Sequence, residues 1–259
     1  MPSRRLAVLI DADNAQASIM QNIFQEIAKL GEITVKRIYG DFTSPQMKKW
    51  KERLQPLAIS PVQQFAYTTG KNATDSSLII DAMDLLHTRT VDGFCLVSSD
   101  SDYTGLAMRI REAGLIVHGF GKSTTPKSFR TACHKFTLTE LLRSTPEDGQ
   151  PATPIAFPGK TAPAQPATGP ERPLPTDLVD LLQKAISQTA GDDGWALLSA
   201  VGSYLTQIKP DFDARSYGYG KLSNLARGAT GLFPIEERPM PYAQSPNAKE
   251  IFIRCSEKS

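Results

Sequence analysis

The chain has 259 residues, of which 40% are hydrophobic and 22% are charged, and its formal net charge is +2. This composition is typical of a folded globular protein, and a charge this balanced does not by itself indicate nucleic-acid binding. The cysteines show no CxxC spacing, which indicates neither a zinc site nor a disulfide framework and favours a cytoplasmic protein. No run approaches the roughly 18 apolar residues of a membrane span, and no signal peptide is expected.

From Leu6 to about Leu142, apolar runs alternate with amphipathic segments. The expected strands are Leu6–Ile10, Ile33–Tyr39, Ile59–Phe65, Phe94–Ser98 and Ile116–Phe120. The expected helices are Ala15–Lys29, Gln46–Leu54, Asp75–Leu86 and Tyr103–Ala113. Because the strands are continuous apolar runs, they fit a parallel sheet that is covered on both faces. The sequence therefore predicts a doubly wound α/β domain over residues 1–145.

Acidic residues stand at the ends of the expected strands. Asp11 closes the first strand, Asp100 and Asp102 follow the fourth, and Asp75 opens the third helix. In an open α/β sheet the carboxyl ends of the strands form the ligand crevice. Carboxylates gathered there repel one another unless a cation lies between them. The pattern predicts a site for a hard divalent ion such as Mg²⁺ or Mn²⁺, and with it phosphate-ester chemistry.

The same residues have simpler structural interpretations. Asp13 or Asn14 is expected to cap the helix after the first strand, and the segment Ser99–Asp102 taken alone fits a cluster of helix caps. Asp81 is rotated away from Asp75 on its helix and is expected to be a structural partner. Asp11 and Asp100 each stand just past the last apolar residue of an expected strand. We therefore prefer a shared metal site to the interpretation that each is independently a helix cap.

Three segments together resemble the NYN family of PIN-like ribonuclease domains. They are Ile10-Asp11-Ala-Asp-Asn14, Lys71-Asn-Ala-Thr-Asp75 with Asp81, and Ser98-Ser-Asp100-Ser-Asp102-Tyr103, and the resemblance covers about Leu6 to Leu142. It implies a PIN-like α/β fold and metal-dependent cleavage of RNA phosphodiester bonds. By motif position, the catalytic and metal-binding carboxylates are Asp11, Asp75, Asp100 and Asp102. Asn14 and Ser99 would line the pocket.

Basic residues near this crevice are candidate substrate contacts. Lys71 precedes the third helix, and the polar loop 121–130 carries Lys122, Lys127 and Arg130 after the last expected strand. We expect these side chains to contact phosphate groups of RNA. The run Lys48-Lys-Trp-Lys51-Glu-Arg53 fits either a phosphate-backbone contact or a solvated helix face, and its sequence does not distinguish the two.

Residues 146–173 are rich in Pro, Ala, Thr and Gly and are expected to form a semi-extended linker. Ordered patterning returns over residues 174–259, where Thr176 is the expected N-cap of a helix at Leu178–Ser187. Further helices are expected near Leu197–Leu205 and Leu222–Ala226, and strands near Leu232–Ile235 and Ile251–Ile253 join through a turn at 245–248. This order of elements is that of a small winged-helix domain.

This second domain resembles the LOTUS (OST-HTH) domain over about residues 174–255. The resemblance rests on Trp195-Ala-Leu-Leu-Ser-Ala-Val201-Gly and on the segment from Asp211 to Leu222. Trp195, Leu198, Val201 and Leu205 are expected to form core along one helix. Arg215, Tyr219 and Lys221 bring cations and aromatics together, as surfaces that grip nucleic acid do. The resemblance implies binding of single-stranded or structured RNA, while some family members bind a protein partner instead.

The expected function is a metal-dependent RNA endonuclease with a tethered RNA-binding winged helix. One alternative is a scaffold that binds RNA or protein without catalysis. Another is a phosphatase with an Asp nucleophile, since Asp11-Ala-Asp13 loosely imitates that signature. The identity of the RNA, the number of metal ions and the formation of a homo-oligomer are left open by the sequence.

Overall fold

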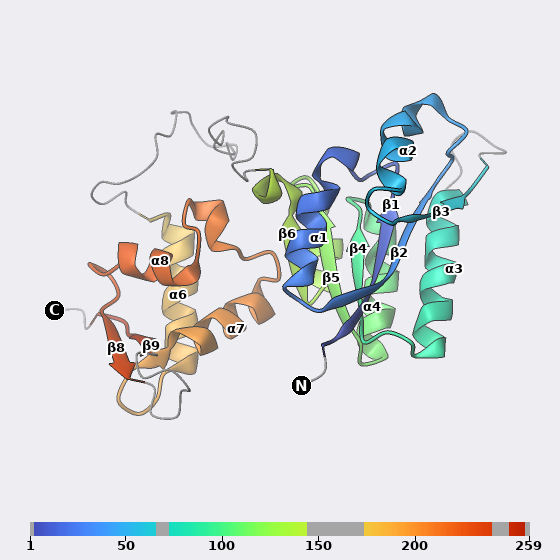
Figure 1. Cartoon of the computed structure of the whole chain (residues 1–259). Coiled ribbons are helices and arrows are strands. Elements are labelled where there is room, and N and C mark those ends of the chain that lie inside the picture. The colour runs from blue at the N-terminus through green and yellow to red at the C-terminus, as the bar shows by residue number, and fades with distance from the viewer. Residues whose placement is uncertain (1–2, 66–72, 144–173, 240–248, 257–259) are drawn as a thin grey trace. The chain divides into compact units, whose positions relative to one another are not determined.

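The computed structural model of the chain describes residues 3–65, 73–143, 174–239 and 249–256 (Figure 1). The chain divides into two compact units, Met1–Ala152 and Thr153–Ser259. The predicted linker at 146–173 and the predicted turn at 245–248 lie outside the described residues. In the described parts of the chain, no helix combines the length and the apolar character needed to cross a membrane.

The first unit contains a parallel sheet of six strands in the order β3-β2-β1-β4-β5-β6. The strands are β1 Arg5–Asp11, β2 Glu32–Gly40, β3 Ser60–Gln63, β4 Gly93–Val97, β5 Ile116–Gly121 and β6 Lys135–Leu138. The α-helices are α1 Met20–Ala28, α2 Lys48–Leu54, α3 Ala73–Thr88, α4 Thr104–Glu112 and α5 Lys127–Ala132. Short 3₁₀ turns stand at η1 Ala17–Ile19, η2 Pro45–Met47, η3 Ser101–Tyr103 and η4 Thr139–Leu142. The predicted doubly wound α/β fold is confirmed.

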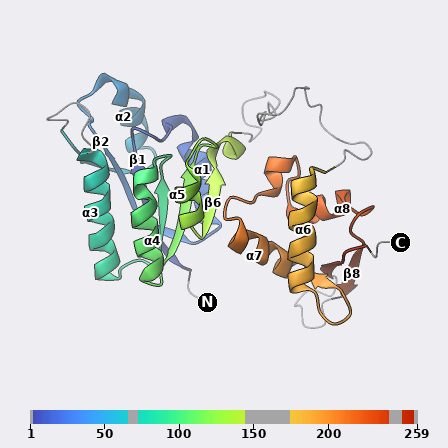
Figure 2. The same ribbon diagram turned by 180° about the vertical axis from the view of Figure 1, so that it is seen from behind.

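Successive side chains of β1 point to opposite faces of the sheet, so the core has two layers. Ala7 and Leu9 pack with residues of α3, α4 and α5, while Leu6, Val8 and Ile10 pack with residues of α1 and α2. The two groups of helices therefore cover opposite faces of the sheet (Figures 1 and 2). Full burial of each Leu, Val or Ile side chain stabilises the fold by about 1.5–3 kcal/mol, which explains why the strand is apolar on both faces.

One strand and one α-helix of the first unit were not predicted. Strand β6 has 4 residues and helix α5 has 6, and neither is long enough to show a clear period in the sequence. The predicted loop 121–130 therefore ends as a helix, because Lys127 is the first residue of α5.

The strand order puts β1 beside β4, with Ile10 opposite Val97 in the register. The chain runs from β1 outward to β2 and β3, then crosses to β4 and runs outward to β5 and β6. The strand order therefore reverses between β1 and β4. In open α/β sheets, ligands bind at such a point, beyond the carboxyl ends of the strands.

The second unit is an α/β assembly of winged-helix type. Its elements are α6 Thr176–Thr189, β7 Ala196–Leu197, α7 Leu198–Ile208, η5 Ala214–Tyr217, α8 Leu222–Gly228, β8 Ile235–Pro239 and β9 Lys249–Ile253. The strands form an antiparallel sheet in the order β7-β9-β8. Leu182, Ile186, Val201, Leu205 and Phe233 belong to its core. The predicted order of three helices followed by a two-stranded ribbon is confirmed, but the first ribbon strand begins at Ile235 and not at Leu232, and β7 adds a third strand to the sheet.

Two local predictions in this unit are wrong. Thr176 is the first residue of α6 and not its cap, since the helix begins directly after Pro175 without a side-chain cap. Trp195 precedes β7, outside helix α7, and is not part of the buried core. Its ring instead lies under two guanidinium groups, those of Arg238 at 5.5 Å and Arg254 at 4.9 Å.

Candidate functional site

Asp11 is the last residue of β1, and its side chain is fully buried. Its Oδ1 accepts hydrogen bonds from the backbone N–H groups of Asp13 at 3.0 Å and Asn14 at 3.3 Å. Its Oδ2 accepts from the side-chain amide of Asn14 at 2.8 Å and from the hydroxyl of Ser98 at 2.8 Å. Both oxygens of this carboxylate are thus bound by the protein, and they hold the end of β1 to the loop that follows it.

This network corrects the expected helix cap. The 3₁₀ turn η1 begins after Gln16 without a side-chain cap, and α1 likewise has none, so neither Asp13 nor Asn14 caps the following helix. The carboxylate of Asp11 binds the backbone of those two residues instead. Burial raises the pKa of Asp11, while its hydrogen bonds from Asn14, Ser98 and Asp13 act to lower it.

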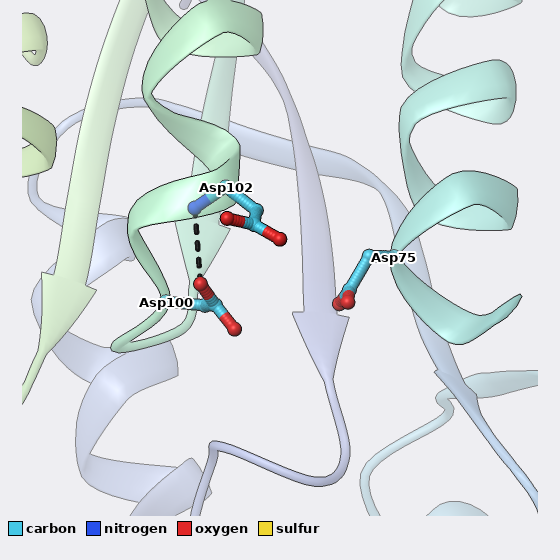
Figure 3. Close-up of side chains that lie close together, drawn as sticks. All are labelled: Asp75, Asp100 and Asp102. Atoms are coloured by element: carbon cyan, nitrogen blue, oxygen red, sulfur yellow. Dashed lines mark hydrogen bonds between the residues drawn. The ribbon is translucent and has the colours of Figure 1, made fainter. Parts of the chain in front are cut away.

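The other three predicted carboxylates lie together (Figure 3). Asp75, Asp100 and Asp102 each offer a carboxylate oxygen, and these oxygens lie within 4.8 Å of one another. Asp75 comes from the first turn of α3, and the other two come from the segment after β4. Asp100 is the N-cap of η3, because its Oδ1 accepts from the N–H of Asp102 at 3.0 Å. We call these three residues the acidic cluster.

Tyr103 binds one member of the acidic cluster, Asp75. The hydroxyl of this buried residue donates to Oδ1 of Asp75 at 2.6 Å. Burial raises the pKa of Asp75, the Tyr103 hydrogen bond lowers it, and the negative charges of Asp11, Asp100 and Asp102 raise it further. A set of carboxylate oxygens at this spacing fits a hard divalent cation, whose charge would offset their mutual repulsion.

Asp11 is not a member of the acidic cluster, although its charge acts on Asp75. The structure therefore brings three of the four predicted ligands together and engages the fourth in protein hydrogen bonds. Asp81 also lies apart from the cluster, where it accepts from the hydroxyl of Tyr39 and forms an ion pair with Arg37.

Two further acidic groups lie at this edge, namely Asp13, which the sequence predicts as a helix cap, and Asp41, which was not predicted. Burial raises the pKa of Asp13, a hydrogen bond from Thr74 lowers it, and the charges of Asp75 and Asp41 raise it. Asp41 directly follows β2, just as Asp11 closes β1. The rule that singled out Asp11 would also have found Asp41. Nothing in the sequence signals that Tyr103 supports Asp75.

The predicted substrate contacts fall into separate places. Asn14, Ser99 and Lys122 line one small pocket beside Ser98, and the N–H of Lys122 donates to the hydroxyl of Ser99 at 3.0 Å. Lys127 is exposed at the start of α5, and Arg130 is half-buried in the same helix. Lys71 lies outside the described residues.

In the second unit, the entry to α8 is ordered by local contacts. Arg215 donates two hydrogen bonds through Nε and one through Nη2 to the carboxylate of Asp213, which also caps η5. Gly218 has a φ of 88°, a left-handed conformation that suits glycine at this turn. The ring of Tyr219 packs so closely on Gly228 that an added Cβ would lie 2.7 Å from it. Lys221 is exposed before α8.

Among the solved structures with some likeness to the chain are proteins from two different organisms. A protein of unknown function from Vibrio parahaemolyticus has a TM-score of 0.43 and 19% identity, and the match covers 52% of this chain and 91% of that one. An uncharacterized protein from Nitrosomonas europaea has a TM-score of 0.30 and 34% identity, with 40% of this chain and 95% of that one covered. No curated protein matches the chain.

Two family models match the sequence in the order in which the two units occur. The model of the NYN domain matches residues 5–140, which span the six-stranded sheet and its helices. The model of the OST-HTH/LOTUS domain matches residues 172–241. The six-stranded parallel sheet with helices on both faces fits the PIN-like α/β fold. The chain therefore belongs to the NYN domain family and carries an OST-HTH/LOTUS domain after its NYN domain.

Proposed function

We propose that the chain is a metal-dependent endonuclease that hydrolyses phosphodiester bonds of RNA. The observation that supports this most is the acidic cluster, whose three carboxylates meet within 4.8 Å at the carboxyl edge of the sheet. That edge is where ligands bind in open α/β sheets. The pairing of an NYN domain, from a PIN-like nuclease family, with an OST-HTH/LOTUS domain supports RNA as the substrate. A cytoplasmic location is part of the proposal.

In this proposal, Asp75, Asp100 and Asp102 hold Mg²⁺ or Mn²⁺ through carboxylate oxygens. The bound ion would supply positive charge for the leaving oxygen and lower the pKa of an attacking water. Tyr103 keeps the carboxylate of Asp75 in place through its hydrogen bond. Asp11 adds negative charge beside the cluster and orders the loop at Asn14. No side chain of the protein needs to act as a nucleophile.

In this proposal, substrate phosphates would be bound by basic and polar groups elsewhere on the same domain. Lys122 and Asn14 line the small pocket next to Ser98 and Ser99, and Lys127 is exposed on α5. Lys71 and Arg130 remain part of the proposed set. The lysine and arginine side chains of this set would offset the charge of the RNA backbone, which otherwise disfavours its approach to a group of carboxylates, and Asn14 would add a neutral amide.

The alternative of a phosphatase with Asp11 as nucleophile is opposed by the hydrogen bonds of that residue. Nucleophilic attack needs an oxygen with an available lone pair and access to the substrate. Asp11 is fully buried, and each of its oxygens accepts two hydrogen bonds from the protein. The scaffold alternative predicts no divalent-ion binding, and the experiment below tests it as well.

The OST-HTH/LOTUS domain would hold the RNA through the entry to α8. Lys221 supplies an exposed cation, while Arg215 and Tyr219 add a guanidinium group and an aromatic ring that are partly exposed. A covalent connection between the two domains would give an effective RNA concentration on the order of mM at the nuclease site. A protein partner of this domain remains the alternative.

The decisive test is cleavage of mixed single-stranded RNAs by the full chain with Mg²⁺ or Mn²⁺, and again with EDTA. We expect cleavage that EDTA abolishes. Asp75→Asn and Asp100→Asn should reduce it by at least about a hundredfold, because each removes a charged ligand. Asp84→Asn is the matched control, since Asp84 is an exposed residue of α3 outside the acidic cluster. Undiminished cleavage by Asp100→Asn would contradict the proposal, and calorimetry without any Mn²⁺ binding would favour a scaffold.

A further inference from the structure

A second hollow lies beside the loop that surrounds Asp11, and we call it the α2 groove. Residues of the β1–α1 connection, including Asp13, Gln16 and Ser18, line one side, and Gln46, Lys49 and Trp50 line the other. Its volume is about 470 Å³. This lies within the range of about 300–1,000 Å³ that small-molecule sites occupy, so the groove has room for one nucleotide unit.

The groove is built on the same backbone as the proposed catalytic site. The N–H of Asp13 donates to Asp11 at 3.0 Å, and the charge of Asp75 acts on the carboxylate of Asp13. The indole N–H of Trp50 donates to the carbonyl of Ala12 at 3.1 Å, and the residue is only 4% exposed. Trp50 therefore ties α2 to the loop, and Asp13, which lines the groove, lies close enough to Asp75 for the charge of Asp75 to act on it.

Asp13 contributes an exposed carboxylate to the lining of the groove, while Gln16, Gln46 and Lys49 contribute hydrogen-bond donors. The side-chain oxygen of Gln16 accepts from Arg143, and the side-chain oxygen of Gln46 pairs with the hydroxyl of Ser44 at 3.3 Å. Each amide is thus left with its NH₂ group to offer to a ligand. Lys49 adds an exposed ammonium group at the rim. Such a set suits a molecule with an anionic group and several acceptor atoms on a planar ring.

We propose that the α2 groove binds the nucleotide adjacent to the scissile phosphate of the RNA. In this arrangement Lys49 contacts a backbone phosphate, and the amides of Gln16 and Gln46 donate to acceptor atoms on the base edge. The inference rests on the proposed nuclease function, because it extends the RNA path from the acidic cluster across Asp13. The inference also assigns different roles to the basic residues of α2. Lys49 lines the groove, while Lys48, Lys51 and Arg53 are exposed elsewhere on the helix surface.

The kinetic test compares two lysines on one helix. Lys49→Glu should raise KM for a short single-stranded RNA about tenfold and leave kcat nearly unchanged, because it alters binding and not the acidic cluster. Lys51→Glu changes the charge of the chain by the same amount and should alter KM less than about twofold. Ser18→Trp, which places a large ring at the rim, should act like Lys49→Glu. Equal effects of Lys49→Glu and Lys51→Glu would overturn the inference.

A second measurement separates this inference from the nuclease proposal. The full chain is irradiated with a short 4-thiouridine RNA in EDTA, and the crosslinked peptides are identified by mass spectrometry. Crosslinks within residues 12–18 or 46–50 support the groove even if the RNA is never cleaved. A chain that cleaves RNA but forms no crosslink in these peptides keeps the nuclease proposal and overturns the groove. Crosslinks confined to the OST-HTH/LOTUS domain overturn the groove as well.

Discussion

The hydroxyl of Ser98 donates a hydrogen bond to Asp11 at 2.8 Å, across the boundary between β4 and β1. The same oxygen accepts from the N–H of Asp100 at 3.0 Å. The buried hydroxyl of Ser98 thus links the carboxylate of Asp11, at the end of β1, to the backbone of Asp100, which follows β4 and belongs to the acidic cluster. The positions of Asp11 and Asp100 are coupled through Ser98, although they lie far apart in the sequence.

We expect Ser98→Ala to lower the free energy of unfolding by about 1–3 kcal/mol, because it leaves a buried carboxylate with one donor fewer and removes the acceptor for Asp100. Cleavage should also fall, since Asp100 is then less well positioned. Urea unfolding and RNA cleavage measure the two effects. Ser101→Ala is the matched control, because Ser101 is exposed in η3 and its substitution should change neither quantity appreciably. Equal stability of Ser98→Ala and wild type would contradict the coupling.

Tyr103→Phe tests whether the tyrosine supports the acidic cluster. The ring stays packed in the core, but Asp75 loses its hydrogen bond from the hydroxyl. We expect the Kd for Mn²⁺, measured by calorimetry, to rise about tenfold, as is common when a group that orients a metal ligand is removed.

The control for that experiment is Tyr39→Phe. This substitution also removes a hydroxyl that donates to an aspartate, but Asp81 lies outside the acidic cluster. It should lower stability and leave the Kd for Mn²⁺ unchanged. Equal loss of Mn²⁺ affinity in both variants would show that Tyr103 acts only through the stability of the fold.

His118 should make the chain less stable in mild acid. Burial lowers the pKa of His118 to about 4, with further lowering by the positive charges of Lys135, His134 and Arg4. The unfolded chain binds this proton near pH 6.5, so between about pH 6.5 and 4 it holds more protons than the folded chain. Stability must therefore fall as pH falls through this range, by about 2 kcal/mol once the partial exposure of the ring is allowed for.

Thermal unfolding of wild type and His118→Leu at neutral pH and near pH 4.5 measures this contribution. The difference in Tm between the two pH values should be smaller in the variant. His134, whose pKa burial also lowers, is present in both proteins and cancels from the comparison. An identical pH dependence of Tm in the two proteins would show that His118 is not the group responsible.

Lys221→Glu tests the nucleic-acid role of the second domain. Reversal of this exposed charge should weaken RNA binding by the full chain and reduce the salt dependence of binding by about one ionic contact. Lys184→Glu changes the charge equally at an exposed position of α6 and should have a much smaller effect. Fluorescence anisotropy at several salt concentrations gives both quantities. If Lys221→Glu binds RNA like wild type, the domain contacts RNA elsewhere or binds a protein partner.

Much of the fold follows from periodicity in the sequence. Continuous apolar runs such as Leu6–Ile10 predict buried parallel strands, and the lengths of the intervening segments predict crossover helices. Residues 135–138 escaped prediction because a strand of 4 residues beside a helix of 6 leaves no readable period. Trp195 was wrongly predicted to be a core residue for a different reason. An aromatic residue near a helix is taken for part of the core unless the partners of its ring are known, and here those partners are Arg238 and Arg254.

The sequence by itself determined that carboxylates stand at the ends of strands and at the start of a helix, because strand ends can be read from where apolar runs stop. It also determined that Asp11 and Asp100 would share one sheet edge if their strands were neighbours, and they are. Only the tertiary structure decided which carboxylates face one another. Asp11 is bound by four protein hydrogen bonds, while Asp75, Asp100 and Asp102 converge. The direction of a side chain depends on donors such as Ser98 and Tyr103 that packing brings from distant segments, and no local pattern encodes them.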